Sequence, residues 1–361
     1  MACDSLYCAW LKVHHPYELY VTMLKLYDEK KNTDKISAII SEMKRYKNIS
    51  LLPGRWGQDN RDWLVDKGHE TISQSISSIR YMSKQAAEDL YELSSKPEAE
   101  IGVELIPAKL NKEGKLAEKE LKAEIAKVEA LELTEEEANI YNDKFTAEKD
   151  AIWSNPEYLE QKAEAIHHTA QLDCFTNVLR AIQMNTCLDT RQIKILIELG
   201  YFADFGGSGK LMKIYNEYFE GQNKVTKTIK SFLQRLEKIR IYENSLEDEE
   251  LSIREKLQSE AENIGLCLSV DESVNPWVYF VQNVDEKWGT TVKLYSISNG
   301  KSGPVKFRKA DLAKKPVCAN QLIQIIDGNR SPRYTYKNGK RTKIPGEEEY
   351  WVKKYNILKA I

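Results

Sequence analysis

The chain has 361 residues, and its 53 Lys and Arg nearly balance 55 Asp and Glu, for a formal net charge of −2. This length allows two or three domains with separate hydrophobic cores. No apolar run reaches the roughly 20 residues of a membrane-spanning helix, and the N-terminal residues lack the pattern of a signal peptide. We therefore expect a cytoplasmic, multidomain protein that does not bind a membrane.

Residues 1–96 are expected to form a mostly helical region. Apolar residues recur near the helical period up to Met43, and Thr33 or Asp34 is a candidate cap for the third helix. Pro53 and two nearby glycines then predict a loop that enters a short strand, and a further helix is expected over about 83–94.

Residues 97–165 change composition to Glu, Lys, Ala and Leu, with 18 acids against 9 lysines between Glu98 and Glu164. Good helix formers and Glu/Lys pairs four residues apart predict one or two helices. We expect an acidic helical arm inserted into the domain, with surfaces that either repel or mimic a polyanion.

Residues 166–262 return to a compact helical pattern around the stretch LGYFADFGGSGKLMKIY, from Leu199 to Tyr215. Asp189 is expected to cap one helix and Gly200 to end it, and Ser208 is expected to cap a second helix from Lys210 to Glu220. In such a turn, backbone N–H groups at a helix N-terminus can face a DNA phosphate. The candidate residues for duplex binding are Gly206, Gly207, Ser208, Gly209, Lys210 and Lys213.

Two other interpretations of this turn are open to the sequence. The glycines can serve only as a corner between two helices, where positive φ angles are needed. A nucleotide-binding P-loop is disfavoured, because Asp204 stands where that motif has its first Gly and Leu211 where it has Ser or Thr.

Residues 263–361 change to a period of two from Trp277 onward, with five short strands rich in Val, Ile, Tyr and Phe. From Lys287 to the end there are 17 Lys and Arg against 5 acids. A small OB-like β-barrel that binds single-stranded DNA through basic and aromatic side chains is expected. The candidate residues are Trp288, Lys293, Tyr295, Lys306, Arg308, Lys309, Arg333 and Tyr336. Alternation along the strands requires some of the aromatic residues to be core.

Six cysteines are scattered without a Cys-x-x-Cys pair, and the two His-His pairs stand apart from them. Reduced thiols are therefore expected, rather than disulfides or a zinc site.

Three stretches in order resemble one family, the alpha subunit of bacterial and phage DNA polymerase III. LYCAWLKVHHPYELY with the following NTDKISAII resembles the end of its fingers, TRQIKILIELGYFADFGG resembles its helix-hairpin-helix region, and EAENIGLCLS resembles the segment before its OB domain. The resemblance implies the C-terminal portion of a replicative nucleotidyltransferase that grips duplex DNA and the single-stranded template.

The departures from that family limit what the resemblance implies. The palm, whose aspartates hold Mg²⁺ for phosphoryl transfer, has no counterpart in this chain, so no cofactor and no catalytic residue is expected here. The family's first hairpin reads IRYMSKQ from Ile79 to Gln85, without its glycines. Implied partners are DNA, the palm portion of the polymerase and a sliding clamp, although no convincing glutamine-led clamp motif follows Lys213. The alternative is a stand-alone accessory or protein-interaction protein built on polymerase scaffolding.

Overall fold

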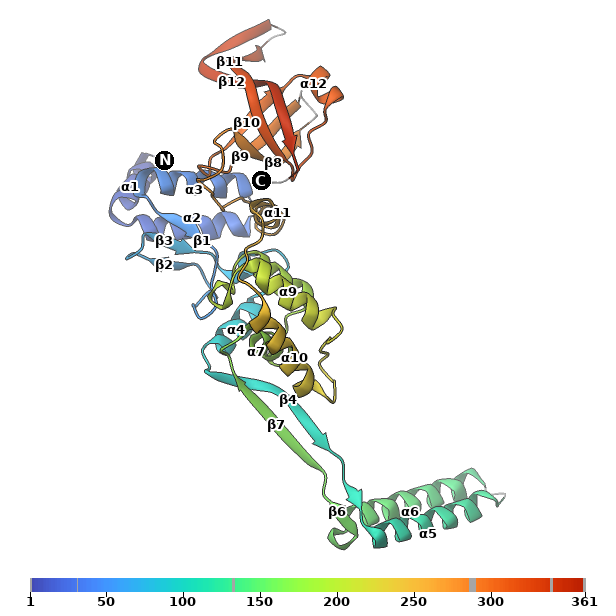
Figure 1. Ribbon diagram of the computed structural model, residues 1–361. Helices are drawn as coiled ribbons and strands as arrows, with labels where there is room; N and C mark the ends of the chain where they lie inside the picture. The colour runs from blue at the N-terminus through green and yellow to red at the C-terminus, as the bar shows by residue number, and fades with distance from the viewer. Residues whose placement is uncertain (1, 31, 132–133, 286–289, 338–339, 360–361) are drawn as a thin grey trace.

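The computed structural model describes residues 2–30, 32–131, 134–285, 290–337 and 340–359. The chain combines helices and strands in an elongated molecule (Figure 1). A β-barrel lies at one end beside the N-terminal helices, a helical body occupies the centre, and a long arm projects from the other end. No helix among these residues is long and apolar enough to cross a membrane.

The N-terminal part packs three helices against a small sheet. Its elements are α1 (Ala2–His14), α2 (Pro16–Glu29), α3 (Thr33–Lys47), β1 (Ser50–Leu52), β2 (Leu64–Asp66) and β3 (Thr71–Ser73), with strand order β1-β3-β2. Tyr20, Leu24 and Met43 are buried in its core. The cap of α3 is Asn32, whose side chain accepts a hydrogen bond from the Lys35 N–H, and not Thr33 or Asp34 as the sequence predicted.

The central body is built from helices that share one core. These are η1 (Ile76–Ser78), α4 (Lys84–Ser94), α7 (Phe175–Asn185), α8 (Thr190–Glu198), η3 (Ala203–Phe205), α9 (Ser208–Phe219) and α10 (Phe232–Ser245), followed by α11 (Ile253–Asn263), which leads to the barrel. Its core joins Trp56 and Leu90 with residues 175–239 and so crosses the predicted boundary at residue 96. Asp189 caps α8, and Gly200 follows its end at φ 75°, as predicted.

The arm is a two-stranded ribbon that carries a helical hairpin (Figure 1). The ribbon pairs β4 (Glu98–Ile106) with β7 (Glu164–Gln171); beyond it lie β5 (Lys109–Leu110), α5 (Lys112–Glu129), α6 (Glu135–Ser154), η2 (Pro156–Tyr158) and β6 (Leu159–Gln161). The helices were expected, but the ribbon was not.

A buried arginine fixes the root of the arm. Arg180 of α7 is 1% exposed, and its Nε donates to the Ile101 carbonyl of β4 at 2.6 Å. Its Nη1 donates to the Thr226 carbonyl at 3.0 Å, and its guanidinium carbon lies 4.9 Å from the centroid of the Phe232 ring. Arg180 therefore ties the ribbon to the loop before α10.

The C-terminal part is a closed five-stranded barrel with strand order β10-β12-β11-β8-β9. Its elements are β8 (Val278–Asp285), β9 (Thr290–Ser296), β10 (Ser302–Phe307), α12 (Lys309–Lys314), β11 (Leu322–Lys337) and β12 (Lys340–Leu358). All neighbours are antiparallel except β10 and β12, which are parallel. The sequence predicted a turn at 327–332, but β11 continues through it with irregular register at Asp327 and Pro332.

Candidate nucleic-acid interface

The glycine turn before α9 is covered by an acidic segment of the same chain. This segment, which we call the acidic cover, comprises residues 247–250 between α10 and α11. Asp248 accepts a hydrogen bond from the Gly207 N–H at 2.6 Å, and the Glu249 carbonyl accepts one from the Lys210 N–H at 2.9 Å. Glu250 accepts hydrogen bonds from the Ser208 hydroxyl at 2.7 Å and from the Ser208 N–H at 3.3 Å. Because unpaired N–H groups at a helix N-terminus attract anions, the protein's own acidic residues occupy the place predicted for a phosphate.

The glycines of the turn are explained by this close approach. A Cβ on Gly207 would lie 2.4 Å from the Glu249 carbonyl oxygen, and one on Gly209 would lie 2.9 Å from it. Gly206 has φ 134°, a conformation that side chains rarely adopt. The acidic cover can lie against the turn only because these positions have no side chain.

The predicted duplex-binding residues are therefore brought together, but most of their donors are already used. Ser208 is the first residue of α9 and not its cap, which is Gly207. Lys213 forms an ion pair with Glu249, and this hydrogen bond raises the pKa of the lysine. Within the described part of the chain, Lys210 has no ion-pair partner. The expectation of a turn open to DNA is corrected, because the acidic cover closes it.

The outer face of β9 and β10 carries the basic residues predicted for single-strand binding. Residues directly opposite each other in an antiparallel pair share a face. Lys306 lies opposite Thr291 and Lys293 opposite Pro304, while their neighbours Val292, Leu294 and Val305 pack in or against the barrel core. Lys306 donates from Nζ to the Thr291 hydroxyl at 2.6 Å. We call this surface the outer basic face.

Tyr295 belongs to the same strand face but is not available to a nucleic-acid base. Its side chain is 2% exposed, and its hydroxyl donates to the Ser269 carbonyl at 2.9 Å. It packs with Leu257 of α11 and Cys267, and burial raises the pKa of its phenol far above the ordinary value. The prediction of a stacking role for Tyr295 is wrong in this structure, because the segment before β8 covers the end of the outer basic face.

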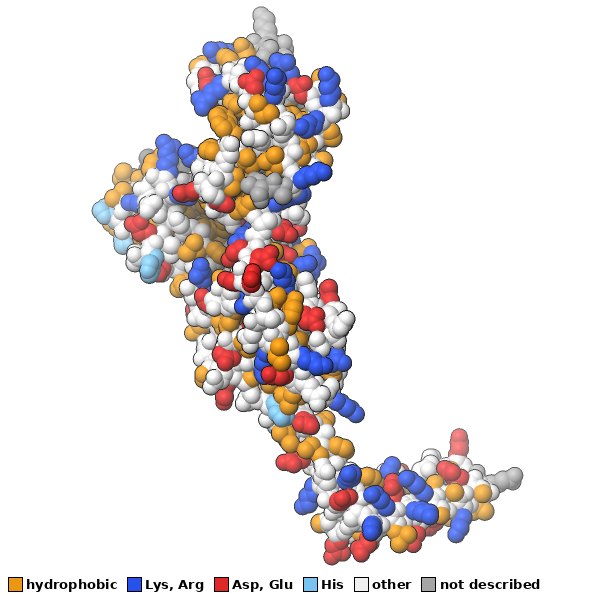
Figure 2. Space-filling model, viewed as in Figure 1, with side chains coloured by type: hydrophobic (Ala, Val, Ile, Leu, Met, Phe, Trp, Pro, Cys, Tyr) orange, Lys and Arg blue, Asp and Glu red, His pale blue; other side chains and the backbone are white. Residues whose placement is uncertain are grey.

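The remaining predicted residues divide into two places. Arg308 and Lys309 are exposed where β10 passes into α12, next to the outer basic face. Arg333 is exposed on the part of β11 that extends beyond the barrel and donates to Glu347 at 2.8 Å. Tyr336 pairs with Arg341 across that ribbon, and Trp288 lies outside the described residues. Figure 2 shows Lys and Arg side chains spread over the barrel with some Asp and Glu among them, and both charges interspersed on the arm.

The sequence reading missed a second group of basic residues at the end of α3. Lys44, Arg45 and Lys47 flank Tyr46 in the sequence; Tyr46 is 66% exposed, and the Arg45 guanidinium lies over its ring. A Cβ placed on Gly300, in the turn between β9 and β10, would lie 4.0 Å from the Lys44 Nζ. The run KRYK is visible in the sequence as a basic, aromatic stretch. Its position next to the barrel cannot be predicted from the sequence.

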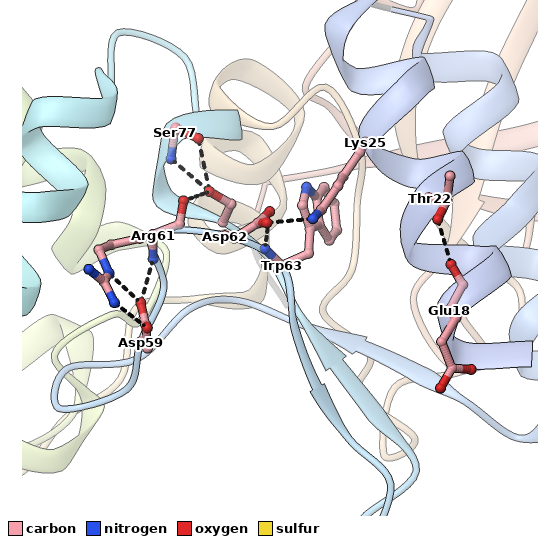
Figure 3. Close-up of polar contacts among 9 residues, drawn as sticks. Glu18, Thr22, Lys25, Asp59, Arg61, Asp62, Trp63 and Ser77 are labelled. Atoms are coloured by element: carbon pink, nitrogen blue, oxygen red, sulfur yellow. Dashed lines mark hydrogen bonds and ion pairs between the residues drawn. The ribbon is translucent and has the colours of Figure 1, made fainter. Parts of the chain in front are cut away.

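A cleft of about 520 Å³ between α2, residues 59–63 and α4 has balanced charges (Figure 3). Lys25 from α2 reaches across it to Asp62, which also accepts the Trp63 N–H at 2.7 Å. Arg61 donates to both carboxylate oxygens of Asp59, at 2.8 and 2.7 Å. Because Lys25 and Arg61 are paired in this way and four acidic residues also line the cleft, it is a weaker candidate for an anion site than the outer basic face.

In the described parts of the chain, no group of three or more His, Cys, Asp or Glu is placed to hold a metal ion. No protein-family model matches the chain, and no curated protein matches it either. A function must therefore be inferred from the residues and their geometry.

Proposed function

We propose that this chain is the DNA-binding C-terminal part of a polymerase similar to the DNA polymerase III alpha subunit. Its barrel would hold the single-stranded template and its helical body would lie against the duplex. The observation that carries this proposal is the outer basic face, where Lys293 and Lys306 are diagonal neighbours on β9 and β10, next to exposed Arg308 and Lys309. A basic groove of this kind follows the backbone of a single strand.

The strand order of the barrel supports an OB-fold. That fold is a five-stranded Greek-key barrel that binds oligonucleotides on its second and third strands. In this chain those strands are β9 and β10, which carry the outer basic face. The three stretches that resemble the polymerase family occur in the family's order, and the third, EAENIGLCLS, directly precedes this barrel.

In this proposal, α8, the glycine turn and α9 are the helix-hairpin-helix unit, but duplex contact there requires the acidic cover to move. Asp248 and Glu250 hold the N–H groups that a phosphate would need. Single-stranded DNA is therefore the favoured ligand, because its proposed surface on the barrel needs no rearrangement of the acidic cover. Polymerisation chemistry and its Mg²⁺ would belong to a palm outside this chain.

The test is a binding titration of the full chain with labelled single-stranded and duplex DNA at several salt concentrations. For a single strand, log K should fall with log salt by about 0.7 for each phosphate engaged. Removing three charges at Lys306→Ala, Arg308→Ala and Lys309→Ala should lower the slope by about 2. The matched control is Lys115→Ala, Lys119→Ala and Lys127→Ala on the exposed face of α5, which should leave it unchanged. Salt-independent or absent binding by the unaltered chain would reject the proposal.

A second candidate is a stand-alone interaction protein that uses the arm. Two observations favour it: the acidic cover closes the glycine turn, and the α5–α6 hairpin projects far from the body (Figure 1). The DNA sequence upstream of Met1 separates the two functions. An adjoining reading frame with palm aspartates favours the polymerase, and an isolated gene favours the interaction protein.

A further inference from the structure

A basic surface at the junction of the N-terminal helices and the barrel has no assigned role. It consists of Lys44, Arg45 and Lys47 in the last turn of α3 and Lys301 in the turn between β9 and β10. The position of the Lys44 ammonium beside Gly300 brings the two elements together. We call these four residues the junction cluster.

The cations of the junction cluster lack carboxylate partners among the residues that the structure describes. Some lysines elsewhere on the molecule are held by acids, as in the pairs Lys12–Glu42 at 2.6 Å and Lys67–Glu18 at 2.7 Å. Lysines in the last turn of a helix favourably oppose its dipole, which accounts for α3 alone. It explains neither Lys301, which comes from another element, nor the exposure of Tyr46.

Tyr46 supplies a flat apolar surface next to Arg45, on the side of α3 away from Lys44. Its side chain is 66% exposed, and the Arg45 guanidinium carbon lies 5.2 Å from the centroid of its ring. Exposed Tyr and Arg also suit protein partners, but this cluster adjoins the barrel whose outer basic face is proposed to hold a single strand. Single-stranded nucleic acid matches both the charges and the ring, because its phosphates pair with cations and its bases stack on aromatic rings.

We propose that the junction cluster is a second binding segment for the single strand that lies on the outer basic face. The strand would pass from Lys306 and Lys293 across the outside of the segment that covers Tyr295 to Lys301 and Lys44, and then past Arg45 to Tyr46 of α3. This inference rests on the proposed function of the barrel. It adds that the N-terminal helices and the barrel hold one continuous strand together.

The experiment compares two oligothymidylates, one of about 8 nucleotides that fits the roughly 4–16 nucleotides of a single barrel of this kind, and one of about 30. The variant carries Lys44→Ala, Arg45→Ala and Lys47→Ala, and the control is the same Lys115, Lys119 and Lys127 triple on α5. For the long strand, the variant should lower the salt slope by about 2 relative to the control. For the short strand, variant and control should agree. Matching thermal midpoints will show that both are folded.

A second measurement uses Tyr46→Trp, which keeps a stacking ring and reports on it. Quenching of the added fluorescence by the long strand, in excess of that by the short strand, is the expected result. Equal competition by inorganic polyphosphate of similar charge would show a general polyanion surface and overturn the inference.

The outcomes separate the two proposals. If the unaltered chain binds both strands but the junction variant behaves like the control on each, the junction inference is overturned and the barrel proposal stands. If the unaltered chain binds neither strand, the proposed function fails and the inference fails with it.

Discussion

The hydroxyl of Ser208 donates a hydrogen bond of 2.7 Å to a carboxylate oxygen of Glu250, 42 residues further along the chain. Ser208 is buried at 5% exposure, and Glu250 also pairs with Lys256 at 2.9 Å. The acidic cover is thus tied to the start of α9 and to α11 at once. It belongs to the packing of the central body as much as to its surface.

Glu250→Gln is expected to weaken the fold in a pH-dependent way. Burial raises the pKa of Glu250, but hydrogen bonds from Lys256 and Ser208 outweigh it and the net pKa is lowered from 4.5. A lowered folded pKa stabilises above the unfolded value, and the contribution is lost as pH falls through the folded one. The variant should lose about 1 kcal/mol of unfolding free energy at neutral pH and nothing in strong acid. Urea unfolding at both pH values measures it, with exposed Glu247→Gln as the unaffected control.

Gly209→Ala tests whether the acidic cover lies on α9 in solution. Alanine in a helix is normally better than glycine by about 1 kcal/mol, but here its Cβ would lie 2.9 Å from the Glu249 carbonyl oxygen. We expect a loss of about 1–2 kcal/mol in unfolding free energy. Gly303→Ala, where a Cβ meets nothing within 4 Å, should be neutral or slightly stabilising. A stabilised Gly209→Ala protein would show that the cover is displaced.

Arg180→Met should be among the most destabilising single changes in the central body. It leaves the Ile101 and Thr226 carbonyls without the donors at 2.6 and 3.0 Å that now satisfy them. Hydrogen bonds to a charged group contribute about 1.5–3 kcal/mol each, so losing both should lower the unfolding free energy by about 3 kcal/mol or more in chemical denaturation. Arg191→Met is the comparison, because that exposed arginine lies over Tyr81 and should cost under about 1 kcal/mol. Equal losses would contradict the role given to Arg180.

Tyr295→Phe separates packing from DNA binding. The change removes one buried hydrogen bond, from the phenol to the Ser269 carbonyl, and should lower the unfolding free energy by about 1 kcal/mol. Affinity for single-stranded DNA should not change, whereas Lys306→Ala should weaken it. Reduced affinity in a fully folded Tyr295→Phe protein would restore the stacking role that its burial argues against.

The thiols should alkylate in an order set by burial. Burial raises the pKa of Cys174 to about 11 and of Cys267 to about 12, whereas Cys8 and Cys318 are exposed. Each unit of pKa removes about tenfold of the reactive thiolate below that pKa. With iodoacetamide near pH 8, mass spectrometry of peptides should find Cys8 and Cys318 modified at least about tenfold faster. Early modification of Cys267 would show that its end of the barrel opens.

Strong periodicity made the main elements predictable from the sequence. The apolar spacing up to Met43 gave three helices, and alternation after Trp277 gave the strands of the barrel. The ribbon of β4 and β7 was missed because its Glu-rich, Ala-containing strands have helix-forming composition, and only their pairing with each other makes them strands.

The candidate site was predictable residue by residue but not in its environment. The sequence placed Tyr295 and Lys293 on one strand face, yet only the fold shows that residues near Ser269 cover the tyrosine. In the same way, the glycines around Ser208 indicated that another group packs closely against this turn, without showing which one. The segment that approaches is Glu249, about forty residues later in the chain. Residue spacing does not reveal this contact, because it depends on long-range packing.

The geometry of the arm also has a mechanical consequence. A two-stranded ribbon resists stretching along its strands but twists and bends readily, since among the described residues no third strand pairs with β4 or β7. Helix α7 and Phe232 brace only its root. Any load on the α5–α6 hairpin would therefore act as a torque about the ribbon's root, where Arg180 holds the Ile101 carbonyl. The arm is therefore flexible along its length and held rigidly at its root. A force on its tip should first strain the contacts of α7 and of the loop before α10.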